Sequence, residues 1–214
     1  MTTEHFSLFA ATFVTFFVLI DAIGVAPIFA SLTSKGSAAW RRSMAIRATI
    51  VAAIIIFAFA FGGAWLLDAM HISIDAFRAA GGVLLFLIAL DMVFEKRTER
   101  REHRAEEVMA EHPGPEDDIA VFPIGIPMIA GPGTIATAML YMSNSTGIID
   151  KAIVLAALGL NLVLCLGIFL LAGPLVKALG DSIVGALTRI LGVILAALSI
   201  QLLIDGIKGA FGLA

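Results

Sequence analysis

The sequence predicts an all-α membrane protein with six transmembrane helices in two inverted three-helix repeats. Of its 214 residues, 60% are hydrophobic and only 14% are charged, and the mean hydropathy is +1.01. This composition excludes an ordinary soluble domain. Six apolar stretches reach the roughly 20 residues that a hydrocarbon core of about 30 Å requires. The first and fourth stretches contain Pro and Gly within the apolar run, so we expect helices 1 and 4 to be discontinuous.

The six apolar stretches fall into two groups of three, one on each side of a charged segment. Their predicted bounds are 6–32, 44–67, 72–94, 119–142, 152–179 and 183–207. The first repeat is therefore expected at 1–94 and the second at 119–214. No basic segment precedes the first stretch and no small-residue cleavage site follows it, so we expect a membrane span rather than a signal peptide. A re-entrant hairpin in place of the first span is the alternative.

The segment 95–118 carries five Lys or Arg and nine Asp or Glu, which predicts a solvated cytoplasmic linker. Its first part can form a helix with i,i+4 ion pairs that ends at the Pro-Gly-Pro of 113–115. A regulatory or lipid-headgroup role is the alternative. With the N-terminus outside, 11 of the 14 basic residues lie on the inner side. The positive-inside rule therefore predicts a multi-pass protein of the cytoplasmic membrane with both termini outside.

Short similarities between the two halves indicate an internal repeat. Residues 23–27 and 124–127 both contain Ile-Gly followed closely by Pro. Residues 78–81 and 189–192 both place an Arg three residues before a Gly. Because each half has three spans, the second half must enter the membrane from the opposite face, which makes the repeat an inverted one.

The fourth stretch is the principal candidate for a binding site. Unsatisfied backbone groups cost several kcal/mol each in hydrocarbon, so a broken helix persists only where protein or a cavity supplies partners. Gly131 and Gly133 allow the chain to turn and to approach a ligand, Thr134 is suited to cap the next helix, and Thr137 adds a second hydroxyl. Backbone N–H groups at the start of a half-helix attract a carboxylate. The alternative is a kink whose hydroxyls bond back to the preceding turn.

Asp21 lies about fifteen residues into the first apolar stretch, where a carboxylate costs roughly 2.5–3.5 kcal/mol on insertion scales. It could bind a substrate ammonium group or carry a coupling proton. Alternatively, it could cap the half-helix that contains Gly24 and Pro27. The two roles are compatible.

Other polar residues of the apolar stretches have simpler explanations. Asn161 and Gln201 could line a cavity, but membrane helices also use such amides as interhelical hydrogen-bonding groups. Near the ends of their spans, polar heads can reach headgroups or water, and this explains Arg78, Arg189, Asp91 and Asp205.

Signals for enzymatic chemistry are weak in this sequence. The four His residues lie in termini and loops without metal-ligand spacing, and no GxSxG, Walker A or GxGxxG pattern occurs. The single cysteine, Cys165, lies in an apolar run and cannot form an intrachain disulfide. We therefore expect no enzyme activity, no metal, no cofactor and no nucleic-acid partner.

Three motifs resemble the MarC family of six-span inner-membrane proteins of bacteria and archaea, which includes the small neutral amino-acid transporters called SnatA. They are FFVLIDAIGVAPIFASLT at 16–33, FRAAGGVLLFLIALDM at 77–92 and VFPIGIPMIAGPGTIATAML at 121–140, and the resemblance covers essentially the whole chain. Members usually have Pro directly after the Asn or Asp of the first motif, where this chain has Ala22. The first break is therefore expected to be less sharp.

The resemblance implies secondary transport or export of small neutral amino acids, such as glycine, alanine, serine or threonine, by alternating access. It implies substrate contacts at Asp21, Gly24, Gly125, Gly131, Gly133 and Thr134. The residue pattern adds Thr137, Asn161 and Gln201 to the candidate substrate-binding residues. The expected partners are the amino acid, the lipid bilayer and a coupling proton or sodium ion, with a homo-oligomer left open.

Three other functions are compatible with parts of the pattern. The first is an ion or other small-solute exporter or channel on the same scaffold. The second is an intramembrane enzyme with Asp21 as acid or base, which would need a second carboxylate or a His in the same layer. The third is a scaffold without transport, which would leave the breaks in the first and fourth stretches unexplained.

Overall fold

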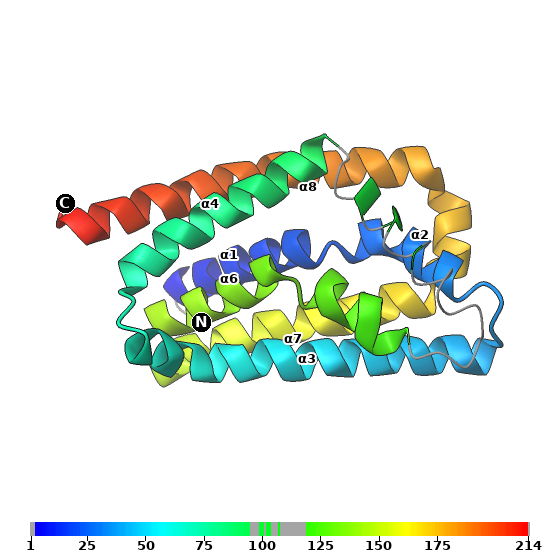
Figure 1. The fold of residues 1–214 in the computed structure, drawn as a ribbon, viewed down its shortest axis with the longest axis horizontal. Helices are drawn as coiled ribbons and strands as arrows, with labels where there is room; N and C mark the ends of the chain where they lie inside the picture. The colour runs from blue at the N-terminus through cyan, green and yellow to red at the C-terminus, as the bar shows by residue number, and fades with distance from the viewer. Residues whose placement is uncertain (1–2, 95–98, 101, 104–106, 108–118, 214) are drawn as a thin grey trace.

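The computed structural model of the chain describes residues 3–94, 99–100, 102–103, 107 and 119–213. All regular structure in these residues is helical, as the composition and the apolar stretches predict (Figure 1). The elements are α1 (Thr3–Ile20), α2 (Ala22–Leu32), α3 (Ala38–Ala69), α4 (Ile74–Val93), the π-helical segment η1 (Ala120–Ile129), α6 (Pro132–Asn144), α7 (Ile148–Leu170) and α8 (Ala172–Phe211). Most of the predicted linker, 95–118, lies outside the described residues.

Five helical segments are long and apolar enough to cross a membrane, and a sixth is present if a bent pair counts as one span. The five segments are Thr3–Leu32, Ala38–Ala69, Ile74–Val93, Ile148–Leu170 and Ser182–Phe211. The pair Ala120–Ile129 and Pro132–Asn144 is bent by 57°. The described part of the chain is therefore that of a multi-pass membrane protein.

The predicted fifth span, 152–179, differs from the observed helices. α7 ends at Leu170, and α8 begins at Ala172 with a short segment that runs across the end of the bundle (Figure 1). Gly180 then adopts φ 71° and ψ 159°, a backbone conformation open to glycine because it has no Cβ atom. The chain turns there before the last span. Apolar composition alone does not reveal this turn, because a largely apolar run continues from α7 into the start of α8.

Local sequence explains where the helices of the first half begin. The Ser37 hydroxyl accepts a hydrogen bond of 3.1 Å from the Trp40 amide at the start of α3. The Ser73 hydroxyl accepts one of 3.1 Å from the Ala76 amide at the start of α4. Each serine satisfies a backbone donor that has no partner within its helix.

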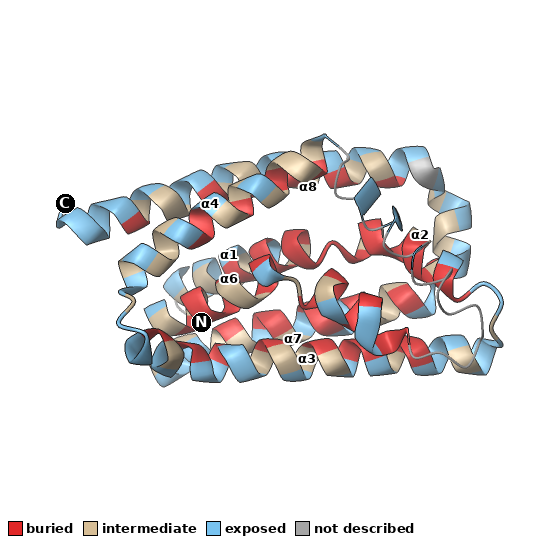
Figure 2. Cartoon of the chain, in the orientation of Figure 1, coloured by how far each residue is buried: buried red, intermediate tan, exposed pale blue. Residues whose placement is uncertain are grey.

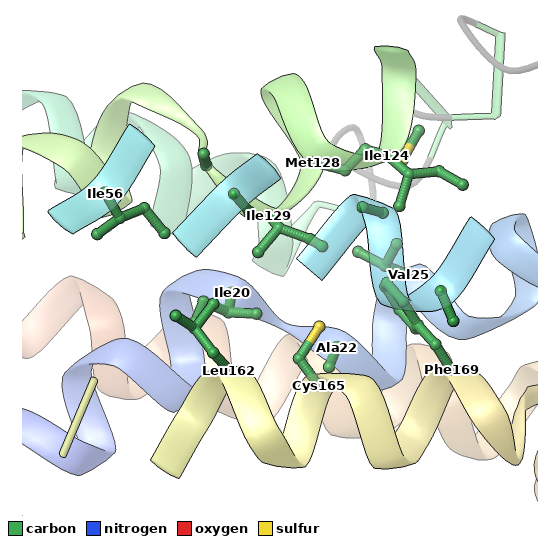
Figure 3. Close-up of a cluster of buried hydrophobic side chains, with 14 of the residues drawn as sticks. Ile20, Ala22, Val25, Ile56, Ile124, Met128, Ile129, Leu162, Cys165 and Phe169 are labelled. Atoms are coloured by element: carbon green, nitrogen blue, oxygen red, sulfur yellow. The ribbon is translucent and has the colours of Figure 1, made fainter. Parts of the chain in front are cut away.

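The helices enclose a buried core and leave apolar outer faces (Figure 2). α3 packs against η1 and α6, α7 packs against α1 and α2, and α4 pairs with α8. The main core cluster joins residues from both halves, including Val25, Ile56, Ile129 and Phe169 (Figure 3). Large apolar side chains are exposed on the outside, such as Trp65 at 74%. Lipid would cover such a surface in a membrane.

Candidate functional site

The first span is interrupted at Asp21, between α1 and α2. Asp21 adopts φ 49° and ψ 50°, and its carboxylate accepts a 3.2 Å hydrogen bond from the Gly24 amide. Asp tolerates this left-handed conformation better than most residues because its short side chain bonds to nearby backbone. The break is buried: Asp21 is 2% exposed, and the adjoining chain faces α7 near Leu162 and Cys165 (Figure 3). Asp21 thus has the capping role that the sequence offered as one of two alternatives.

The fourth stretch is interrupted between η1 and α6. Within η1, Phe122 and Ile126 have extended backbone angles, and each precedes a Pro that lacks an N–H donor. Ala130 and Gly131 then leave the helical conformation before α6 begins at Pro132. At this break Ala130 is buried, Gly131 is half-buried and Pro132 is exposed. Further back in η1, Gly125 lies close to α3, where an added Cβ would be 3.3 Å from the Ala48 carbonyl oxygen.

A cavity of about 250 Å³ lies at the second break, where α6 starts. Sites for drug-sized ligands measure roughly 300–1,000 Å³, so this cavity fits a smaller solute. Its walls come from α1, α4, η1, α6 and a single residue at the start of the predicted linker. They are lined by Leu19, Ile88, Asp91, Arg100, Pro127, Met128, Gly131, Pro132, Gly133 and Thr134.

The N-terminus of α6 gives the cavity a wall of hydrogen-bond donors. Gly131 provides no side-chain cap, and the first bond of the helix runs from the Ile135 amide to the Gly131 carbonyl oxygen at 3.0 Å. The amides of Gly133 and Thr134 precede that bond, so they lack a partner within the helix. The Thr134 side chain also makes no hydrogen bond with any other described residue. A helix N-terminus with unused donors favours a negatively charged group.

Two opposite charges lie on another part of the cavity wall. Asp91, from the last turn of α4, accepts a charge-assisted hydrogen bond from the Arg100 guanidinium group. Asp91 is 23% exposed and Arg100 70%, so the pair stands at the open side of the cavity. From its place near the end of a span, Asp91 was expected to reach headgroups or water, and the sequence indicates no individual role for Arg100. The signal available for Asp91 was a carboxylate within an apolar run, as for Asp21.

The structure brings together only some of the predicted site residues. Gly131, Gly133 and Thr134 line the cavity. An added Cβ at Gly133 would lie 2.7 Å from Ile88 and 3.4 Å from Leu19, so the start of α6 is packed tightly against α4 and α1. The remaining predicted residues are not among those that line this cavity, and they are Asp21, Gly24, Gly125, Thr137, Asn161 and Gln201.

The amides of Asn161 and Gln201 have other partners. The Asn161 side chain donates to the Phe13 carbonyl oxygen at 3.1 Å and so joins α7 to α1. The exposed Gln201 side chain donates to the Asp205 carboxylate at 2.8 Å within α8. The Asn161 bond matches the interhelical alternative that the sequence offered, whereas the Gln201 bond stays within one helix. In contrast, the Thr137 hydroxyl is buried without a hydrogen-bond partner among the described residues.

Comparison with known proteins extends over nearly the whole chain. Residues 6–211 match the family profile described as MarC family integral membrane protein. The UPF0056 membrane protein MJ1677 of Methanocaldococcus jannaschii is 37% identical over 202 residues, which cover 94% of this chain and 97% of that protein. The UPF0056 membrane protein YhcE of Escherichia coli is 33% identical over 210 residues, with coverage of 98% and 96%. No solved structure matches the chain.

Proposed function

Because the chain belongs to the MarC family of integral membrane proteins, we propose that it is a secondary transporter or exporter of small neutral amino acids. Glycine, alanine, serine and threonine are the proposed substrates. The observation that carries the proposal is the uncapped N-terminus of α6, which opens on a cavity of about 250 Å³ with both charge signs on its wall. The proposed location is the cytoplasmic membrane of a bacterium or archaeon, with both termini outside.

The chemistry of the cavity suits a zwitterion. The substrate carboxylate would bind the free amides of Gly133 and Thr134, where the positive end of α6 favours negative charge. The ammonium group would bind the Asp91 carboxylate in exchange for Arg100. Ile88 and Leu19 restrict the space beside Gly133, which favours substrates with small side chains.

The packing of the helices supports two inverted repeats with discontinuous first helices. α3, from the first half, packs against η1 and α6, and α7, from the second half, packs against α1 and α2. The third helices of the two halves, α4 and α8, pack against each other. Each contact that a helix of one half makes is therefore matched by the contact of the corresponding helix in the other half, as expected for an inverted repeat. Alternating access would rock one half against the other, with Asp21 at the break of the first span as the candidate for a coupling proton or sodium ion.

Uptake of radiolabelled glycine into proteoliposomes tests the proposal. Gly131→Leu puts a side chain on the cavity wall, with its Cβ 2.9 Å from the Pro127 carbonyl oxygen, and should abolish uptake per folded molecule. Gly62→Leu is the control, because an added Cβ at Gly62 has no atom within 4 Å. Wild-type protein that takes up none of the four amino acids, in either orientation and with either coupling ion, would reject the assignment. Equal uptake by Gly131→Leu and the control would reject the site.

A carboxylate on the cavity wall also suits a cation, so an ion exporter or channel is the second candidate. Calorimetric titration separates the two functions. If the protein transports amino acids, addition of glycine should give a measurable heat of binding. This heat should be smaller in Gly131→Leu. Heat with sodium or potassium ions alone, unaffected by glycine, would favour the ion function.

A further inference from the structure

A second cavity, of about 510 Å³, lies at the opposite end of the structure from the chain termini (Figure 1). It is enclosed by the end of α2, the start of α3 and the turn from α7 into α8. Arg41, Arg42 and Lys177 line it, and none of the described residues that line it is acidic. The cavity therefore combines three positive charges with no carboxylate from the described part of the chain on its wall.

Two of these charges lack a protein partner in the described part of the chain. Neither Arg42 nor Lys177 has an ion pair or a side-chain hydrogen bond there. Arg41 donates to the Gly36 carbonyl oxygen at 2.8 Å, which fixes its position but leaves its charge uncompensated. Positive charges around one cavity raise the local electrostatic potential, and this potential attracts an anion into the cavity.

Apart from Thr33 and Ser34, the other side chains that line the cavity are apolar. Phe29 and Phe169 stack at a centroid distance of 4.7 Å and an interplanar angle of 4°, and both are buried. Leu170 also lines the cavity and is 47% exposed at the outer surface. A free inorganic anion gains nothing from contact with apolar surface, whereas an acyl chain is stabilised there by the hydrophobic effect.

The position of the cavity corresponds to the headgroup level of a membrane. The last span begins at Ser182, so the short segment of α8 that carries Lys177 precedes it and runs across the end of the bundle (Figure 1). The same end carries Lys35 and Arg47. The positive-inside rule assigns this end to the cytoplasmic leaflet, where basic pockets between helices bind acidic headgroups.

We propose that this second cavity binds the phosphate headgroup of an anionic phospholipid. Arg42 and Lys177 contact the phosphate, and the beginning of one acyl chain lies against Leu170 and the surface over Phe29 and Phe169. The site is separate from the amino-acid cavity at the start of α6 and does not depend on the transported solute.

Native mass spectrometry of the full-length protein in detergent tests this proposal. The probes are dioleoylphosphatidylglycerol, dioleoylphosphatidylcholine and sodium phosphate at equal concentrations. We expect wild-type protein to retain phosphatidylglycerol and neither of the other two probes. In Arg42→Gln/Lys177→Gln, the affinity for phosphatidylglycerol should fall roughly thirtyfold, which corresponds to about 1 kcal/mol for each charge.

Two further variants distinguish lipid binding in this cavity from non-specific attraction of an anionic lipid to the basic end of the protein. Lys35→Gln/Arg47→Gln removes two charges from the same end without touching the cavity, and it should retain the lipid. Arg42→Lys/Lys177→Arg keeps both charges and should retain it too. If the first double variant does not fold, each of Arg42→Gln and Lys177→Gln should weaken binding about fivefold. Equal lipid retention by all variants, equal loss in the Lys35/Arg47 control, or charge-dependent binding of phosphate alone would each overturn the proposal.

Discussion

Gly82 of α4 and Gly192 of α8 occupy reciprocal positions in the contact between these two helices. An added Cβ at Gly82 would lie 2.8 Å from the Ser199 carbonyl oxygen, and one at Gly192 would lie 3.1 Å from the Ala89 carbonyl oxygen. Adding 110 to the residue numbers of Gly82 and Ala89 gives Gly192 and Ser199. Reciprocal contacts of this kind are typical of a two-fold relationship, and they support the proposed inverted repeat.

The close approach at Gly82 predicts a sharp difference between two adjacent glycines. Gly82→Ala should lower the free energy of unfolding by about 1–3 kcal/mol, because the new methyl group meets backbone atoms of Leu203 that cannot move aside. Gly81→Ala is the matched control, since an added Cβ there has no atom within 4 Å. Thermal unfolding in detergent measures both. Equal stability of the two variants would contradict the observed packing of α4 on α8.

The sequence predicted the proposed repeat, but it did not predict the register that the packing supports. Short matches align Gly24 with Gly125 and Arg78 with Arg189, and these pairs are not separated by the same interval. The structure instead places Asp21 and Gly131 at the starts of α2 and α6, and adding 110 to 21 gives 131. The register follows from contacts between residues far apart in the chain, such as those of Gly82 and Gly192. A short sequence match cannot reveal these contacts.

Asp21 allows its capping role to be separated from a role in transport. Asp21→Asn keeps both the acceptor for the Gly24 amide and the tolerance for a left-handed backbone, so its stability should be close to wild type. Asp21→Ala loses the cap and is strained, and it should be destabilised by about 2–3 kcal/mol. Uptake per folded molecule is the second measurement. Normal uptake by Asp21→Asn would assign Asp21 to capping alone, and loss of uptake in this stable variant would indicate that the charge is used.

The Thr134 hydroxyl predicts an effect on substrate binding. Thr134→Val keeps the shape of the side chain and removes a cavity hydroxyl that has no partner among the described residues, so KM for glycine should rise about fivefold. Thr49→Val is the control, because the Thr49 hydroxyl donates to the Ala45 carbonyl oxygen at 2.9 Å away from the cavity. Uptake kinetics in proteoliposomes measure both variants. An unchanged KM in Thr134→Val would remove this hydroxyl from the binding site.

The sequence predicted three of the ten residues that line the cavity and missed Asp91 for a physical reason. Gly131, Gly133 and Thr134 were recognisable because a Gly-Pro-Gly triplet within an apolar run breaks a helix wherever it occurs. Asp91 was not, because its role depends on where the end of α4 meets α6, and that contact joins residues far apart in the chain. Asp91 lies near the end of its own span, and this position alone predicts contact with headgroups or water rather than with a substrate.

The ion pair of Asp91 and Arg100 predicts a functional effect with little change in stability. The pair is partly exposed, and such pairs contribute about 0–1 kcal/mol, so Asp91→Asn should unfold at nearly the wild-type temperature. Glycine uptake should nevertheless fall, because the proposed ammonium partner is lost. Glu107→Gln is the control: Glu107 lies 3.3 Å from His103 in an exposed pair and does not line the cavity. Equal uptake by both variants would remove Asp91 from the site.

The buried Asn161 and the exposed Gln201 allow a structural role for amides within the spans to be tested against a role in binding. Asn161→Leu removes the hydrogen bond between α7 and α1, and such bonds contribute about 0.6 kcal/mol on average and about 1.7 kcal/mol at most in membrane proteins. The unfolding temperature should therefore fall while KM for glycine stays constant. Gln201→Leu should change neither, because Gln201 is exposed and its bond to Asp205 stays within one helix. A raised KM in Asn161→Leu at unchanged stability would return Asn161 to the substrate pathway, and it would require a cavity that reaches α7 in a second conformation of the protein.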